Sequence, residues 1–71
     1  MSYIGEYYQV MKQMNGVWTV VYDSCDRAGL TEYIRQLRPG QRIDTKTPLR
    51  ELACLVGPAY ALYSRGRQIL P

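Results

Sequence analysis

The sequence predicts an α+β fold, with an N-terminal β-hairpin packed against two short α-helices and a short strand near the C-terminus. An Asn15-Gly16 pair stands between two stretches rich in Val, Tyr and Trp, which is typical of a hairpin. Two later segments repeat apolar residues at helical spacing. A chain of 71 residues has room for a single small domain, residues 1–71.

The hairpin depends on Asn15-Gly16, because both central residues of a type I′ turn need positive φ and these two adopt it at low cost. We expect strands over residues 6–14 and 17–23. If Met14 pairs with Val17 and each further pair steps outward by one, both faces of the hairpin are about half apolar. One face then packs on the helices, and the other is a candidate protein interface. Its residues are Tyr7, Met11, Trp18, Val20 and Tyr22.

The next segment, DRAGLTEYIRQLRPG, has the period of an amphipathic helix. Its apolar residues fall at i, i+3, i+4 and i+7 and form one stripe, made of Leu30, Tyr33, Ile34 and Leu37. Either Ser24 or Asp26 can provide the N-cap oxygen, and Pro39-Gly40 ends the helix.

A short extended piece around residues 42–44 then leads to a second helix, with Thr47 as N-cap and Pro48 at the first helical position. The same spacing gives a stripe of Leu49, Leu52, Ala53 and Val56, and Gly57-Pro58 ends the helix. Residues 59–71 are ambiguous between helix and strand, and alternation near Tyr60 and Leu62 favours a strand.

The net charge of +3 is concentrated in residues 27–50, which hold six Lys and Arg against two Asp and Glu. At 100° per residue, Arg27, Arg35 and Arg38 lie beside one another on the flank of the first helix. With Arg42, these arginines are the candidate contacts for an acidic partner or for nucleic acid. A solvated basic face is the simpler alternative.

The two cysteines, Cys25 and Cys54, form no CxxC pair, and we expect free, mostly buried thiols. The first ten residues contain neither a basic leader nor an apolar run, so we expect a cytoplasmic location. The longest uncharged stretch, residues 52–64, is too short for a membrane span and is interrupted by Gly57-Pro58.

Catalysis has little support in the residue types present. The chain has no histidine, no arrangement of carboxylates typical of acid and base chemistry, and no glycine-rich phosphate motif. Two cysteines without histidine cannot build a four-ligand zinc site within one chain. We therefore expect no enzymatic activity, no cofactor, no metal site and no small-molecule substrate.

The sequence favours a protein-binding module, with another protein or a second copy of the chain as partner. Every aromatic residue is Tyr or Trp, and these residues suit surfaces that are partly buried and partly wet. Such a domain fits a small stand-alone regulator or inhibitor that occupies a site on larger machinery, a type common among mobile genetic elements. The alternative is a small basic nucleic-acid-binding domain that uses the arginine flank of the first helix.

Overall fold

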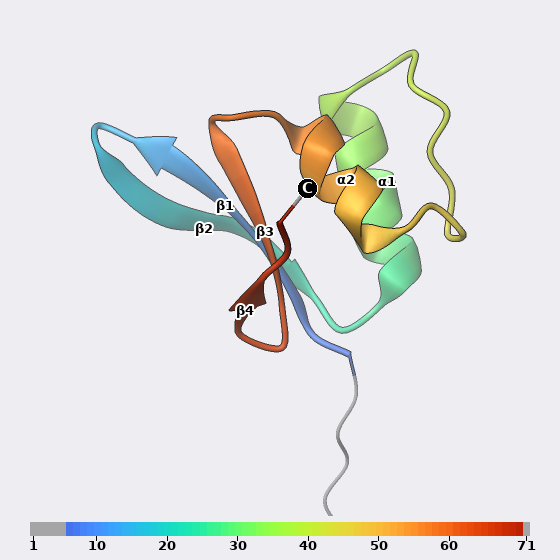
Figure 1. Ribbon diagram of the computed structural model, residues 1–71, viewed down its shortest axis with the longest axis horizontal. Helices are drawn as coiled ribbons and strands as arrows, with labels where there is room; N and C mark the ends of the chain where they lie inside the picture. The colour runs from blue at the N-terminus through green and yellow to red at the C-terminus, as the bar shows by residue number, and fades with distance from the viewer. Residues whose placement is uncertain (1–5, 71) are drawn as a thin grey trace, which may run out of the picture.

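The predicted α+β class is confirmed: a four-stranded antiparallel sheet carries two helices on one side (Figure 1). The computed structural model describes residues 6–70. Residues 1–5 and residue 71 lie outside this range. The expectation that the chain has no leader peptide depended partly on residues 1–5. The strands follow the order β2-β1-β3-β4 across the sheet. In chain order, the elements are β1 (Tyr8–Met14), β2 (Val17–Ser24), α1 (Arg27–Leu37), α2 (Leu49–Val56), β3 (Tyr60–Ser64) and β4 (Arg67–Gln68).

The first hairpin forms as predicted near its turn. Met14 pairs with Val17, and Asn15 and Gly16 have φ of 53° and 79°. The predicted register holds as far as the pair of Met11 with Val20. The next partner of β1 is Tyr22 rather than Val21, so β2 contains a bulge. The predicted register is therefore wrong from Val21 onward.

The bulge moves Tyr22 to the face of the sheet that the helices cover. Its ring stacks on Tyr33 of α1, with 4.5 Å between ring centroids and 11° between ring planes. Gly29 leaves room for this contact, because a Cβ there would lie 2.7 Å from the Tyr22 hydroxyl. Tyr22 therefore helps to attach α1 to the sheet, and the prediction that it shares a face with Trp18 is wrong.

Both N-cap candidates for α1 take part in starting the helix. Asp26 is the N-cap, and its carboxylate accepts a hydrogen bond from Ala28 N at 3.1 Å. The Ser24 hydroxyl accepts from Asp26 N at 2.9 Å and so holds the chain ahead of the cap. The helix ends after Leu37, just before the predicted Pro39-Gly40 signal.

The start of α2 differs from the prediction by one residue. Pro48 is the N-cap and Leu49 the first helical residue, and Thr47 does not cap the helix with its side chain. The Thr47 hydroxyl instead accepts from Asp44 N at 3.0 Å and donates to the Asp44 carboxylate at 3.3 Å. Thr47 therefore closes the loop before α2, and residues 42–44 form no strand.

The C-terminal segment is a second hairpin, and the preference for a strand is confirmed. The strands β3 and β4 are joined by Arg65 and Gly66, both at positive φ. Beyond β4, Ile69 N donates to Leu62 O at 2.8 Å. The strand β3 is distant from β1 in the sequence but pairs with it, so β3 becomes a central strand of the sheet.

The core lies between one face of the sheet and the two helices. Both predicted helical stripes are confirmed, with Leu30, Ile34, Leu52 and Val56 fully buried. We call the covered side of the sheet the inner face and the opposite side the outer face. The buried cluster comprises Tyr8, Val10, Leu30, Ile34, Ile43, Leu52, Ala53, Val56 and Leu62.

Candidate protein-interaction surface

The outer face combines side chains from three strands. Alternation along a strand and the pairing of β1 with its neighbours place every second residue on this side. No element within residues 6–70 packs over it (Figure 1). Its members are Tyr7, Gln9, Met11 and Gln13 from the β1 segment, Trp18, Val20 and Asp23 from β2, and Ala61 and Tyr63 from β3.

Large side chains on this face are open to solvent. Trp18 is 44% exposed, Val20 42% and Tyr7 38%, and Met11 beside them is half-buried. The set is rich in aromatic residues, and its one charged side chain, Asp23, lies at the end of β2 away from Trp18. Such a composition is typical of the centre of a protein–protein interface, where Tyr, Trp and Met are enriched and charges are depleted.

A single carboxylate borders the face near the end of β2. Asp23 pairs with Gln9, and it accepts a hydrogen bond from the Tyr7 hydroxyl at 3.3 Å. Partial burial raises the pKa of the Tyr7 phenol above its ordinary value, and the negative charge of Asp23 raises it further. The phenol therefore stays protonated and holds the acidic group at the edge of the apolar surface.

Four of the five predicted interface residues lie together. Tyr7, Met11, Trp18 and Val20 share the outer face, whereas Tyr22 lies on the inner face against α1. The sequence reasoning missed Ala61 and Tyr63, because the pairing of β3 with β1 depends on tertiary packing rather than on a local motif. It also missed the exposure of Met14 and Val17 at the tip of the hairpin, at 46% and 62%.

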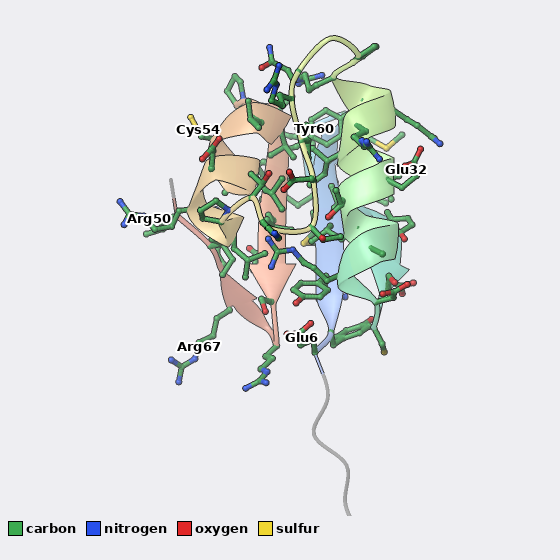
Figure 2. The ribbon with its side chains drawn as sticks, turned by 90° about the vertical axis from the view of Figure 1, so that its right-hand side faces the viewer. Glu6, Glu32, Arg50, Cys54, Tyr60 and Arg67 are labelled. Carbon is green, nitrogen blue, oxygen red and sulfur yellow. The ribbon has the colours of Figure 1, made fainter. Side chains whose placement is uncertain are left out.

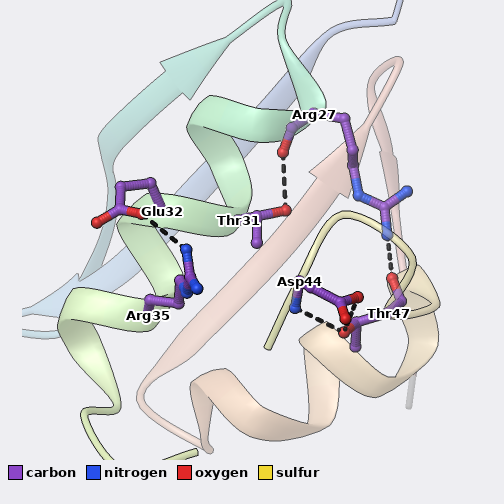
Figure 3. Close-up of polar contacts among 6 residues, drawn as sticks. All are labelled: Arg27, Thr31, Glu32, Arg35, Asp44 and Thr47. Atoms are coloured by element: carbon purple, nitrogen blue, oxygen red, sulfur yellow. Dashed lines mark hydrogen bonds and ion pairs between the residues drawn. The ribbon is translucent and has the colours of Figure 1, made fainter. Parts of the chain in front are cut away.

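Two of the predicted contact arginines are engaged within the fold (Figure 3). The Arg27 guanidinium donates to the backbone carbonyl of Thr47 and so connects α1 to the loop before α2. Arg35 forms an ion pair with Glu32 at 3.1 Å, one helical turn away. The pair is exposed, and it neutralises part of the arginine flank of α1.

Arg38 joins the two helices. Its guanidinium donates to the carbonyl oxygens of Leu55 at 2.9 Å and Val56 at 2.6 Å, and it lies 5.8 Å from the centre of the Tyr60 ring. The last carbonyls of a helix have no partner within the helix, so an arginine there satisfies them. Arg38 therefore has a structural role at the C-terminus of α2.

Other cations lie free at the surface. Arg42 is exposed in the loop after α1 and has no hydrogen bond or ion pair to another residue in the range 6–70. Figure 2 shows Arg50 of α2 and Arg67 of β4 projecting from one side of the molecule, with Glu32 of α1 on the other. Arg50 and Arg67 thus lie on the α2 and β4 side of the molecule.

A buried phenol lies close to Arg27. Tyr8 is buried, and burial raises its pKa, with a further increase from Glu6 and an opposing decrease from Arg27. The Arg27 Nε is itself buried without a hydrogen-bond partner among the described residues. These groups fix the position of α1 over β1 and contribute nothing to the outer face.

Groups suited to chemistry are dispersed. Cys25 and Cys54 are free, but both are exposed, so the expectation of mostly buried thiols is wrong. No group of three or more metal-ligating side chains occurs within residues 6–70. A shallow hollow of about 280 Å³ lies between α2 and the C-terminal hairpin, and no charged side chain lines it.

Comparison of the chain with protein-family models, with curated proteins and with solved structures found no match. Of the two helices in the described range, neither has the length and apolar character needed to cross a membrane.

Proposed function

We propose that this chain is a non-enzymatic protein-binding module, a small regulator that occupies a site on a larger protein. The observation that carries the proposal is the largely apolar outer face, where Tyr7, Trp18 and Val20 are exposed around Met11. A contiguous apolar patch rimmed by polar groups on a water-exposed surface marks an interaction site more often than chance.

The geometry of the face supports the same proposal. The backbone beneath this face is held by pairing on both sides of β1, and Trp and Tyr side chains have only two rotatable bonds. Trp18 and Tyr7 therefore lose little conformational freedom when a partner covers them. The side-chain amides of Gln9 and Gln13 can each donate and accept hydrogen bonds. They can therefore bind either donor or acceptor groups of a partner.

Enzymatic activity has less support. The chain has no histidine, and the exposed thiols of Cys25 and Cys54 lie in separate places, one before α1 and one on α2. No charged side chain lines the hollow beside α2, and its polar side chains are Cys54, Tyr60 and Gln68, a small set for orienting a substrate. These observations favour binding over turnover.

The arrangement of the arginines gives the nucleic-acid alternative less support. Arg27 and Arg38 donate to backbone carbonyls of the fold, and Arg35 is paired with Glu32. A phosphate-binding groove needs free donors, and each of these arginines already uses part of its guanidinium within the fold. Arg42, Arg50 and Arg67 remain for such a role, on a different part of the surface.

Affinity capture from a lysate of the cells that produce the protein tests the proposal. The tagged full chain is used as wild type, as Trp18→Ala and as Arg42→Ala, with and without nuclease. We expect a protein partner that survives nuclease, is lost with Trp18→Ala and is kept with Arg42→Ala. Trp18→Ala is preferred to a change at Tyr22, because Tyr22 packs against α1 and its loss would disturb the fold.

The opposite pattern would contradict the proposal. If the captured material is nucleic acid, and if Arg42→Ala or Arg50→Ala weakens its binding while Trp18→Ala does not, the function lies with the arginines. Circular dichroism of each variant checks that the fold is retained.

A further inference from the structure

The strand β2 forms an open edge of the sheet. It is the outermost strand in the order β2-β1-β3-β4, and no other strand of the described range pairs with its free side. An edge strand presents unpaired N–H and C=O groups, which can pair with another chain. At eight residues, β2 is the longest strand of the molecule.

The turn determines which backbone groups face outward. Because Met14 and Val17 close a two-residue turn, they form a hydrogen-bonded pair, and such pairs alternate along an antiparallel hairpin. Thr19 then directs its backbone groups toward Lys12 of β1. Trp18 and Val20 direct theirs away from the sheet, at the free edge.

This edge has little protection against pairing. Between Val17 and Tyr22 the chain contains no charged residue, proline or glycine, and residues 17–21 are all exposed. Natural edge strands are usually short or carry such residues. The bulge at Val21 and the charge of Asp23 are protective features of β2, and both lie beyond the regular segment 17–20.

We infer that β2 pairs in antiparallel orientation with β2 of a second copy, across a two-fold axis at Thr19. In this register Trp18 of one copy lies opposite Val20 of the other, and Val17 lies opposite Val21. Pairs of an aromatic with a β-branched residue stabilise antiparallel strands. The two outward-facing residues, Trp18 and Val20, become hydrogen-bonded partners on either side of the axis.

The charge distribution favours a second copy as occupant of this edge. Residues 17–22 carry no charge, so they have no electrostatic preference for a charged strand of another protein. Two copies of this segment can pair without placing like charges opposite each other. The two copies of Asp23 would lie about 25 Å apart along the strands, well beyond the Debye length of about 10 Å. Arg50 and Arg67 lie on the side of the molecule opposite Glu32 of α1, on α2 and β4 rather than on β2, so these cations of the two chains stay apart.

The dimer extends the proposed function without depending on it. Edge pairing would join two four-stranded sheets into one sheet of eight strands, with all helices on one face. The two outer faces would then be continuous, and Trp18 and Val20 of both copies would lie at the centre of a doubled surface. A partner would meet that surface, whereas the second copy would use the edge.

The first test measures molecular mass by analytical ultracentrifugation over a range of protein concentrations. We expect wild type to move from the 8.2 kDa chain mass toward twice that value as concentration rises. Val20→Pro removes the outward N–H without removing a bond to β1, and it should raise the dissociation constant of the dimer at least about tenfold. Val20→Ala is the matched control, because it shortens the same side chain and keeps the N–H.

The second test reads the register directly and does not need a proline variant that folds. In a Cys25→Ser, Cys54→Ser background, Thr19→Cys places two thiols at the two-fold axis, within the Cα separation of about 4.4–6.8 Å that a disulfide needs. Oxidation with a glutathione redox buffer should give a covalent dimer. Val17→Cys, on the same face but away from the axis, should give much less.

A wild-type chain that stays monomeric at every concentration would overturn the inference. The proposed function would not be affected, because the capture experiment with Trp18→Ala tests it separately. The inference also fails if Val20→Pro dimerises like wild type, or if Val17→Cys crosslinks as fast as Thr19→Cys. A dimer that Trp18→Ala abolishes and Val20→Pro does not would instead be formed by the outer face.

Discussion

The two faces of one sheet have different surroundings. On the inner face, Val10 and Leu62 are buried beneath α1 and α2, and their neighbours are aliphatic side chains of the helical stripes. On the outer face, Trp18 and Val20 are more than two-fifths exposed, although they belong to the same hairpin as Val10. The difference indicates that apolar residues on the inner face stabilise the fold, whereas those on the outer face are available for a partner.

The largest expected effect is on the inner face. Leu52 of α2 is fully buried in the core cluster. Leu52→Ala removes buried apolar surface and leaves a cavity, so we expect a loss of about 2–5 kcal/mol in the free energy of unfolding. Urea denaturation followed by circular dichroism measures the change, and a loss below about 1 kcal/mol would contradict the assignment of Leu52 to a tight core.

Arg38→Ala should produce the next largest loss. The change leaves the carbonyls of Leu55 and Val56 without their donor. We expect a loss of about 2 kcal/mol, because hydrogen bonds to a charged group contribute more than neutral ones. Arg42→Ala is the matched control on an exposed arginine, and equal losses for both variants would show that Arg38 does not cap α2.

Asp26→Ala should cost about 1 kcal/mol, the typical contribution of a side-chain N-cap. Asp26 accepts from Ala28 N, and no acidic side chain in the first turn of α1 can take over its favourable interaction with the helix dipole. Asp26→Asn keeps the capping oxygen and should retain most of the stability. If Asn destabilises as much as Ala, the cap is not the source of the effect.

Trp18→Ala sharpens the comparison between the faces. Trp18 is larger than Leu52, yet it lies on the open face, so we expect a change in unfolding free energy below about 1 kcal/mol. The same denaturation experiment measures it. A loss as large as that of Leu52→Ala would show that the outer face contributes to the fold of the isolated chain.

The stability of the fold is expected to fall at alkaline pH, because Tyr8 is buried and Tyr33 is partly buried. Burial raises the pKa of Tyr8 and Tyr33 above the ordinary value of 10.0, so the folded state keeps these protons longer than the unfolded state. The contribution of these phenols to stability should be fully present below the ordinary value of 10.0 and be lost as the pH rises through the folded pKa values. Thermal melts at rising pH measure this fall, and Tyr33→Phe should reduce it. An unchanged slope in Tyr33→Phe would contradict burial as its cause.

Local signals in the sequence account for much of the fold. The Asn15-Gly16 turn, the two helical stripes and the stop at Gly57 are read from neighbouring residues, and the structure contains each of them. The bulge at Val21 was not predictable, because the contact that accompanies it, the stacking of Tyr22 on Tyr33, joins two separate elements and leaves no local pattern in the sequence. Thr47 had the pattern of an N-cap, but the competing hydrogen bond with Asp44 N fixed it in the loop.

The candidate surface was predictable only in part. Alternation from the turn placed Met11, Trp18 and Val20 on one face, as the structure has them. The contribution of Ala61 and Tyr63 depends on β3 pairing with β1, a contact between distant segments that no local pattern encodes. The partners of Arg27 and Arg38 are backbone carbonyls of other elements, and sequence spacing says nothing about these.

The most direct measurement is the fluorescence of Trp18, the one tryptophan in the chain, during titration with the protein partner recovered by capture. Binding at the outer face should shift its emission to shorter wavelength and reduce its quenching by acrylamide, with the midpoint at the dissociation constant found independently. If the partner binds while the emission and the quenching of Trp18 stay constant, the outer face is not the binding surface.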